Sequence, residues 1–234
     1  MTELILASQP SDLAQEAAEW LTREVSRAIA ERGRCALCLP GGRTPEPVYR
    51  ELASGSPIDW SRVEVYFGDE RAVPPDHPDS NYHLVHRALL SRVPVPPGQV
   101  HRMEAERVDR DAAAQDYERR LPPRIDVLLL GMGQDGHTAS LFPGSAALDE
   151  RQRRVVAVLG AKPPAGRLTI TPPVIEAARS VAVLATGDDK AAMVARALEG
   201  PLDPKAVPVQ LARRGVWFLD HAAAGSLTSP KVAR

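Results

Sequence analysis

The chain has 234 residues, of which 44% are hydrophobic and 25% charged, and its 29 basic residues nearly balance its 30 acidic residues, giving a formal net charge of -1. This composition is typical of a folded globular protein, not of a disordered one, and the length is ample for a hydrophobic core. Near-neutral charge argues against a nucleic-acid coat protein or a polybasic membrane binder, because both need a large positive excess.

Neither a membrane span nor a secretory signal is expected. No run of about 18 apolar residues exists, and the first residues, MTELILASQPSD, lack a basic flank. The two cysteines, Cys35 and Cys38, lie in a strand-like segment, where positions three apart point to opposite faces. A zinc site would need further ligands, so we interpret both as structural. The histidines are scattered and no HExxH motif or carboxylate cluster appears, so we predict neither a metal nor a cofactor. The expected location is cytoplasmic.

The predicted elements alternate between strands and helices along the chain. Residues 3–7 are predicted to form the first strand, and residues 12–32 a long amphipathic helix that Asp12 caps and Gly33 ends. Further strands are expected at 34–39, 63–67, 125–130, 154–158, 167–170, 180–186 and 215–219. After a turn at 40–44, a helix opens at Pro45, and further helices are expected at 80–91, 109–121, 172–178 and 188–199.

Two of the strands, IDVLLL and VAVLAT, are continuously apolar. Such strands are covered on both faces, as in a mostly parallel sheet with flanking helices. No repeat and no linker interrupts the pattern, so we predict a single α/β domain over residues 1–234. In such sheets ligands bind beyond the carboxyl ends of the strands, which directs attention to the four loops after 34–39, 63–67, 125–130 and 180–186.

The first loop, LPGGRTP, runs from Leu39 to Pro45. Its two glycines allow a tight turn, and Thr44 can cap a helix whose first residue is proline. Backbone amides and the helix dipole then favour an anion, most naturally a phosphate. An ordinary strand-turn-helix connection is about as probable for this loop alone, and the loop lacks the Gly-Lys-Ser/Thr of a P-loop.

The second loop, FGDERAVP, places charged residues directly after an apolar strand. Asp69 and Arg71 are candidates for binding sugar hydroxyls and a developing negative charge. Asp79 or Ser80 can cap the following helix, and Glu70 can pair with an arginine, which are the ordinary structural roles for these residue types.

The third loop contains the pattern G-x-G-x-x-G over residues 131–136. A dinucleotide fingerprint would open a long helix, whereas Pro143 and Gly144 end any helix here within two turns. The glycines are therefore interpreted as a crevice that presents Asp135 and His137. We expect His137 to lie near the N-terminus of a short helix, where the dipole favours a neutral imidazole suited to a general base. The alternative is a surface histidine in a turn.

The fourth loop, TGDDK, opens a helix with Lys190 in its first turn. A lysine is unfavourable at a helix N-terminus unless it meets an anion, although Asp188 and Asp189 offset part of that cost.

With these loops in order, the chain resembles the 6-phosphogluconolactonases from about residue 10 to residue 220. The resemblance rests on the segments LPGGRTPEPVY, FGDERAVPPDHPDSNY, LLLGMGQDGHTASLFPG, RLTITPPVIEAAR and TGDDKAAMV. It implies a Rossmann-like α/β fold, with helices on both faces of the sheet, of the glucosamine-6-phosphate deaminase and ribose-5-phosphate isomerase type. It also implies hydrolysis of 6-phospho-D-glucono-1,5-lactone, the second step of the oxidative pentose phosphate pathway, without a metal or cofactor.

The resemblance further implies roles for the loop residues. His137, beside Asp135, would activate water, while Arg71 and backbone amides near Gly133 would stabilise the oxyanion. Asp69 and Asn81 would orient sugar hydroxyls or the histidine. The phosphate would lie between the first loop and Lys190, with a further contact from Arg167; the first-loop residues are Gly41, Gly42, Arg43 and Thr44.

Two other functions stay open, and three positions bear on them. Deaminases carry approximately DGHIAFNEPGS, with a glutamate where this chain has Phe142, and a tyrosine where it has Arg71. Many lactonases have serine at the position of Arg43, so a hydroxyl contact is lost here. A non-catalytic sugar-phosphate sensor is the second alternative, but no segment is spare for a DNA-binding helix-turn-helix. The expected partner is the small sugar-phosphate lactone, without nucleic acid or membrane, on a monomer or weak homo-oligomer.

Overall fold

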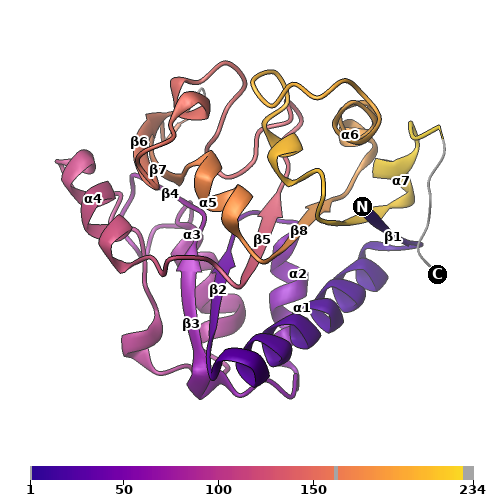
Figure 1. Ribbon diagram of the computed structural model, residues 1–234. Coiled ribbons are helices and arrows are strands. Elements are labelled where there is room, and N and C mark those ends of the chain that lie inside the picture. The colour runs from indigo at the N-terminus through magenta and orange to yellow at the C-terminus, as the bar shows by residue number, and fades with distance from the viewer. Residues whose placement is uncertain (1, 161–162, 229–234) are drawn as a thin grey trace.

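A six-stranded parallel sheet forms the centre of the computed structural model, which describes residues 2–160 and 163–228. Every neighbouring pair in this sheet is parallel, so all six strands end at the same edge (Figure 1). The order is β1 (Glu3–Ala7), β9 (Val216–Asp220), β8 (Ser180–Ala185), β5 (Val127–Gly131), β2 (Cys35–Leu39) and β3 (Val63–Phe67). The predicted α/β class with a mostly parallel sheet is confirmed.

Helices cover the sheet. The long helix α1 (Pro10–Arg32) packs across β1, β9, β5 and β2 and beside α2 (Pro45–Ala53), on one face. In the connection that follows β3, the turn His86–Leu90 also packs against α2. The remaining helices are α3 (Asn81–Val85), α4 (Arg110–Arg120), α5 (Pro172–Ala177), α6 (Ala191–Leu198) and α7 (His221–Ala224). Among the described residues, none of the helices combines the length and the hydropathy that a membrane span requires.

A second, three-stranded antiparallel sheet lies beyond the end of β3, with the order β4 (Asp69–Arg71), β7 (Gly166–Ile170), β6 (Val155–Leu159). The strands β6 and β7 match predicted segments, but β4 was not predicted, because three charged residues carry no strand pattern. Only Gly68 separates β3 from β4. The pairing sets Arg71 opposite Arg167 and Asp69 opposite Thr169. The small sheet therefore brings two predicted site arginines together.

Most element boundaries follow the predictions within one or two residues, with informative exceptions. Helix α1 begins at Pro10 after Gln9, so Asp12 lies in its first turn and is not the cap. Gly33 ends the helix as predicted, with a φ of 78° and its N–H donating to Ile29 O at 2.8 Å. The helix expected at 80–91 is the short α3 followed by a π-helical turn, His86–Leu90.

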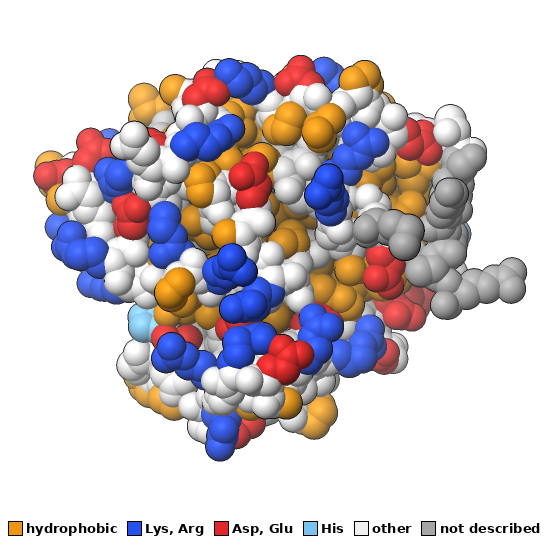
Figure 2. Space-filling model, in the orientation of Figure 1, with side chains coloured by type: hydrophobic (Ala, Val, Ile, Leu, Met, Phe, Trp, Pro, Cys, Tyr) orange, Lys and Arg blue, Asp and Glu red, His pale blue; other side chains and the backbone are white. Residues whose placement is uncertain are grey.

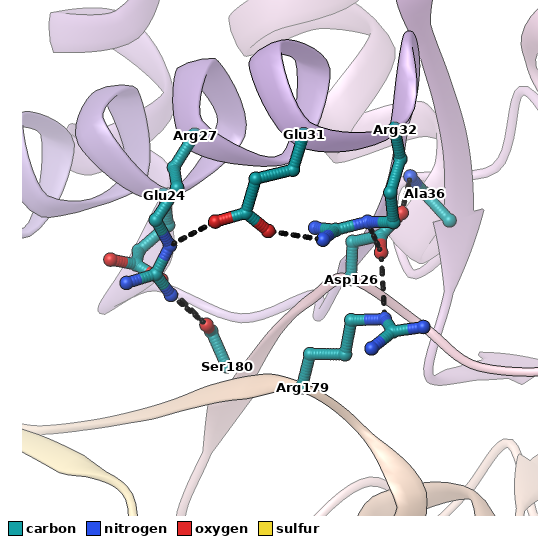
Figure 3. A network of polar contacts seen from close by, with 8 residues as sticks. All are labelled: Glu24, Arg27, Glu31, Arg32, Ala36, Asp126, Arg179 and Ser180. Atoms are coloured by element: carbon teal, nitrogen blue, oxygen red, sulfur yellow. Dashed lines mark hydrogen bonds and ion pairs between the residues drawn. The ribbon is translucent and has the colours of Figure 1, made fainter.

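The amino end of the sheet is held by ion pairs. The side chain of Asp126, just before β5, is 10% exposed and accepts from Arg32 Nε at 2.9 Å and from the Ala36 amide at 2.9 Å, with Arg179 Nε at 3.3 Å. Glu31 binds the same Arg32, so the network ties α1 to the starts of the strands (Figure 3). Basic side chains gather around α1 on the face drawn in Figure 2, and acidic side chains lie among them.

Candidate active site

A polar cavity of about 420 Å³ opens at the carboxyl ends of the parallel strands. All predicted site residues except Asp135 line it. The lining also includes residues that the sequence did not single out, and its full set is Pro40, Gly41, Gly42, Arg43, Thr44, Pro45, Asp69, Arg71, Asn81, Gly131, Met132, Gly133, His137, Ala139, Arg167, Leu184, Thr186, Asp189 and Lys190. The four loops thus converge as the topology requires.

His137 is held by its neighbour Asp135. The Asp135 Oδ1 atom lies 2.5 Å from His137 Nδ1 and accepts the His137 backbone N–H at 3.1 Å. Partial burial raises the pKa of the Asp135 carboxyl, but the charge and hydrogen bonds of His137 outweigh burial, and the pKa lies below its usual value. An ionised acceptor at Nδ1 keeps that nitrogen protonated and leaves Nε2 as the basic atom.

The imidazole lies between a glycine and an aromatic ring. A Cβ added to Gly133 would come within 2.2 Å of the imidazole, so only glycine leaves room for it there. The Phe142 ring packs against the imidazole of His137 in a tilted arrangement, with the ring centroids 5.0 Å apart. Phe142 occupies the position where the deaminase motif has its glutamate, and the carboxylate that contacts His137 is that of Asp135.

One prediction about this loop is wrong. No helix begins near His137, because Thr138 and Leu141 form an isolated bridge and the next helical turn is Ala146–Asp149. Asp135, not a helix dipole, is therefore the electrostatic influence on the histidine. The Gly133 amide itself donates to His137 O at 2.9 Å. The contribution of backbone amides near Gly133 to binding an oxyanion stays a prediction.

Arg71 remains the candidate for stabilising negative charge. Its Nη1 donates to the Asp79 carbonyl at 2.7 Å, and its buried Nε has no hydrogen-bond partner among the described residues. Arg167 stands opposite on β7, with Nε donating to the Pro164 carbonyl at 3.0 Å. Burial first, and then the charge of Arg71, lowers the pKa of Arg167. Two guanidinium groups held side by side favour an anion between them.

Asp69 and Asn81 lie in the cavity wall, but neither contacts His137. Asp69 Oδ1 accepts from Asn81 Nδ2 at 3.0 Å, and Oδ2 accepts from Ser140 Oγ at 2.7 Å. The buried Asn81 Oδ1 has no hydrogen-bond partner among the described residues and occupies the place where a Cβ on Gly41 would lie. Gly41 is therefore required by the approach of Asn81. The predicted contact of these two residues with sugar hydroxyls stays a prediction.

Glu70 forms no ion pair with an arginine of the described ranges. Its buried carboxylate accepts the backbone N–H groups of Arg71, Asn81 and Tyr82 at 2.7 to 2.8 Å and the Ser80 hydroxyl at 3.0 Å. Burial raises the pKa of Glu70 despite these hydrogen bonds, which act in the opposite direction. The carboxylate binds the end of β4 to the start of α3 and so fixes the backbone that carries Arg71 and Asn81. Ser80 caps α3 as predicted, since its side chain accepts the His83 N–H.

The first loop and the Lys190 turn also line the cavity. Gly42 has a φ of 105°, a conformation that other residues rarely adopt. Thr44 precedes Pro45 at the start of α2, but it makes no side-chain cap; its Oγ1 lies 3.0 Å from Thr186 Oγ1. Lys190 is the last residue of a 3-10 turn and directly precedes α6.

The cations of this cavity are not neutralised by carboxylates. Across residues 2–160 and 163–228, none of the four forms an ion pair; they are Arg43, Arg71, Arg167 and Lys190. Burial lowers the pKa of Lys190, and the charge of Arg43 lowers it further, against the opposing effect of Asp189. Unpaired, partly desolvated cations gathered in one cavity indicate an anion-binding site.

Several residues that support the site were missed from the sequence. Gln134 Nε2 donates to Asp189 Oδ2 at 2.5 Å, which joins the histidine loop to the Lys190 turn. Asp220 accepts the Gly187 N–H at 3.1 Å and so holds the same turn from β9. Of these residues, only Thr186 carries a sequence signal, because it directly follows an apolar strand. The contacts of Gln134 and Asp220 join positions far apart in the sequence and leave no local pattern. The described part of the chain contains no group of three or more His, Cys, Asp or Glu arranged to hold a metal ion.

Comparison with known proteins assigns the family. The family model described as glucosamine-6-phosphate isomerases/6-phosphogluconolactonase matches residues 8–218. The chain belongs to this family. It is 41% identical over 235 residues to a 6-phosphogluconolactonase of Mycobacterium tuberculosis, which covers 93% of this chain and 95% of that protein. A rat 6-phosphogluconolactonase is 40% identical over 240 residues, covering 95% of this chain and 93% of the relative.

Solved structures agree. A 6-phosphogluconolactonase from Trypanosoma brucei superposes with a TM-score of 0.86 at 27% identity, covering 97% of this chain and 99% of the other. A monomeric glucosamine-6-phosphate deaminase superposes with a TM-score of 0.85 at 21% identity, covering 96% of this chain and 99% of that one. At that identity the second likeness shows the fold alone, and it confirms the predicted relation to the deaminase fold.

Proposed function

We propose that this chain is a 6-phosphogluconolactonase, which hydrolyses 6-phospho-D-glucono-1,5-lactone to 6-phospho-D-gluconate in the oxidative pentose phosphate pathway. The observation that carries the proposal is one cavity in which a histidine oriented by Asp135 lies with four unpaired cations. Hydrolysis of a phosphorylated lactone needs both features: a base that activates water and cations that bind the phosphate. The lactonase relatives, which match along nearly the whole chain, support the same activity.

His137 takes the first chemical step. Its Nε2 accepts a proton from water as the water oxygen attacks the lactone carbonyl carbon, and Asp135 stabilises the imidazolium that forms. Arg71 stabilises the negative charge on the former carbonyl oxygen. When the bond from that carbon to the ring oxygen breaks, His137 returns the proton to the ring oxygen, which becomes a hydroxyl. The new carboxylic acid loses its proton to solvent.

The phosphate binds away from the carbonyl carbon. The Gly41-to-Thr44 turn at the start of α2 and Lys190 form one wall of the cavity, and we assign the phosphate to that wall. A backbone turn at a helix N-terminus with an adjacent lysine provides both donors and positive charge. Arg167 is a further candidate for contact with the phosphate. Arg43 supplies charge where many lactonases have serine.

A coupled assay tests the activity directly. The purified chain should form 6-phosphogluconate faster than the lactone opens spontaneously. The product is measured through the NADPH that an added 6-phosphogluconate dehydrogenase forms from it. Ammonia release from glucosamine 6-phosphate tests the deaminase alternative. We expect none, because Phe142 stands where the deaminase motif has its glutamate. Ammonia without lactone hydrolysis would assign the chain to the other branch of the family.

The remaining predictions complete this proposal. We propose that residues 1–234 act as a single domain, without a metal or cofactor, as a monomer or weak homo-oligomer, and without nucleic acid or membrane partners. We also propose a cytoplasmic location, since Cys35 and Cys38 are buried free thiols, the state that a reducing compartment maintains.

A further inference from the structure

The segment from His137 to Leu141 has a strained backbone. Ala139 has a φ of 49° and is the only residue other than glycine with a positive φ in the described ranges. A side chain makes this conformation unfavourable, so surrounding contacts must hold it in place. Thr138 provides one such contact, with Oγ1 donating to Gly131 O at 2.8 Å. Strain of this kind is common where a loop must present a reacting group.

Ser140 connects this segment to the small sheet. It is fully buried; its hydroxyl donates to Asp69 Oδ2 at 2.7 Å, and its backbone N–H donates to Thr169 Oγ1 at 3.1 Å. Asp69 and Thr169 are register partners on β4 and β7. Ser140 therefore contacts both strands at the same level of the sheet, through its side chain and its backbone.

The same two strands carry the site arginines. In the register that pairs Asp69 with Thr169, Arg71 faces Arg167 two residues further along β4. Ser140 lies three residues after His137 along the segment strained at Ala139. The hydrogen bond from Ser140 to Asp69 consequently sets the place of the base relative to the arginines. A carboxylate acceptor makes this bond stronger than one between neutral groups.

We propose that Ser140 is a positioning residue for lactone hydrolysis: its hydroxyl, bound to Asp69, holds the strained loop so that His137 and Arg71 of β4 address the same carbonyl group. The proposal rests on the proposed function. Ser140 acts through Asp69 and His137 and does not line the cavity. The main phosphate contacts assigned above, the Gly41-to-Thr44 turn and Lys190, belong to other elements, so loss of the hydroxyl should disturb the chemical step more than substrate binding.

Ser140→Ala is the test variant, and Thr171→Val is its matched control. Thr171 is also fully buried, and its Oγ1 makes one 2.7 Å hydrogen bond, to the Arg153 carbonyl, outside the cavity. We expect Ser140→Ala to lower kcat by about 10- to 100-fold, as small misplacements of reacting groups do, and to change KM by less than about threefold. Thr171→Val should lose comparable stability and keep its kcat. Equal kcat in the two variants overturns the proposal.

A double-mutant cycle tests the route. If the hydroxyl acts through Asp69, Ser140→Ala should lower kcat strongly in the wild type. In the Asp69→Asn variant, the same substitution should lower kcat by less than about twofold. Multiplicative losses would contradict that route.

One readout does not depend on turnover. The ring nitrogen NMR signals of His137 should shift in Ser140→Ala and stay in place in Thr171→Val. An inactive wild type would refute the lactonase function, whereas unchanged His137 signals in Ser140→Ala would refute the positioning role whether or not the wild type is active.

Discussion

Arginines lie at both ends of the parallel sheet, but among the described residues those at the amino end form ion pairs with carboxylates, and those that line the cavity at the carboxyl end do not. At the amino end, Arg32 and Arg179 share the Asp126 carboxylate, and Glu31 binds Arg32 as well. At the carboxyl end, Arg71 and Arg167 face each other without a carboxylate within ion-pair distance in the described part of the chain. The same residue type therefore supports the fold at one end and is left available for a ligand at the other.

The difference has an energetic meaning. Charges gathered without partners disfavour the folded state, and burial together with neighbouring cations lowers the pKa values of Arg167 and Lys190. An anion that binds there removes part of this repulsion, so a ligand should stabilise the protein. The amino end is neutralised within the chain and offers no such gain. Charge alone, visible in the sequence, does not separate the two ends; the position of the carboxylates does.

The largest effect should come from the base. His137→Ala should lower kcat by about 10²–10⁴-fold while product affinity changes little, because the phosphate wall is intact. His221→Gln, on the exposed start of α7, is the control and should behave as the wild type. A kcat for His137→Ala within a fewfold of the wild type would remove the histidine from the mechanism.

Asp135→Asn should come next. The carboxylate that orients His137 is replaced by an amide of the same shape, and a hydrogen bond to a charged group contributes about 1.5–3 kcal/mol. Such a loss corresponds to roughly 10- to 150-fold in kcat. Steady-state kinetics on both variants and on the double variant would check the pairing. If Asp135 acts only through His137, the double variant should be no slower than His137→Ala.

Lys190→Met should affect binding instead of chemistry. We expect KM to rise by about tenfold with little change in kcat, because a phosphate contact serves the ground state and the transition state alike. Stability should change by no more than about 0.5 kcal/mol, since the lost charge has no carboxylate partner in an ion pair. A large fall in kcat at saturating substrate would place Lys190 at the reacting carbonyl.

The pH dependence of product binding should also depend on Lys190. Burial lowers the pKa of Lys190, and a bound phosphate raises it again because it favours the charged lysine. Near the lowered pKa, binding of the phosphate is therefore accompanied by protonation of Lys190. The affinity for 6-phosphogluconate should therefore fall as pH rises through that range in the wild type. In Lys190→Met the affinity should be weaker and should not change with pH there. Isothermal titration calorimetry across the alkaline range measures both.

Asp126→Asn should have the smallest effect on activity. It leaves Arg32 and Arg179 without their shared carboxylate and should cost about 1–3 kcal/mol of unfolding free energy, while kcat and KM remain those of the wild type. Urea denaturation and steady-state kinetics on the same sample measure the two effects. A change in kcat would mean that the two ends of the sheet are coupled.

The sequence predicted the parallel sheet and the four converging loops because those features depend on local apolar runs and on the topology that such runs impose. It could not predict β4, whose residues are all charged and whose pairing with β7 joins positions about a hundred residues apart. The helix expected after His137 was wrong for a related reason: in place of a helical ladder, Thr138 binds the end of the preceding strand β5, and Ser140 binds Asp69 on the distant strand β4.

The site residues show the same division between features that the sequence reveals and features that only the fold creates. His137 and Lys190 could be singled out because each follows a strand within a glycine-containing loop. The partners of Asp69 and Glu70 could not be inferred, since Ser140 and the backbone of α3 come to them only in the folded chain.

The central claim is that the unpaired cations at the carboxyl end bind the substrate anion, and the most direct test is the stabilisation of the protein by 6-phosphogluconate. At a concentration 100 times the dissociation constant, a ligand that binds only the folded state adds about 2.7 kcal/mol to the free energy of unfolding. The wild type and Arg179→Gln should gain this stabilisation to a similar extent, whereas Lys190→Met should gain much less at the same concentration. Equal stabilisation of all three proteins would contradict the account.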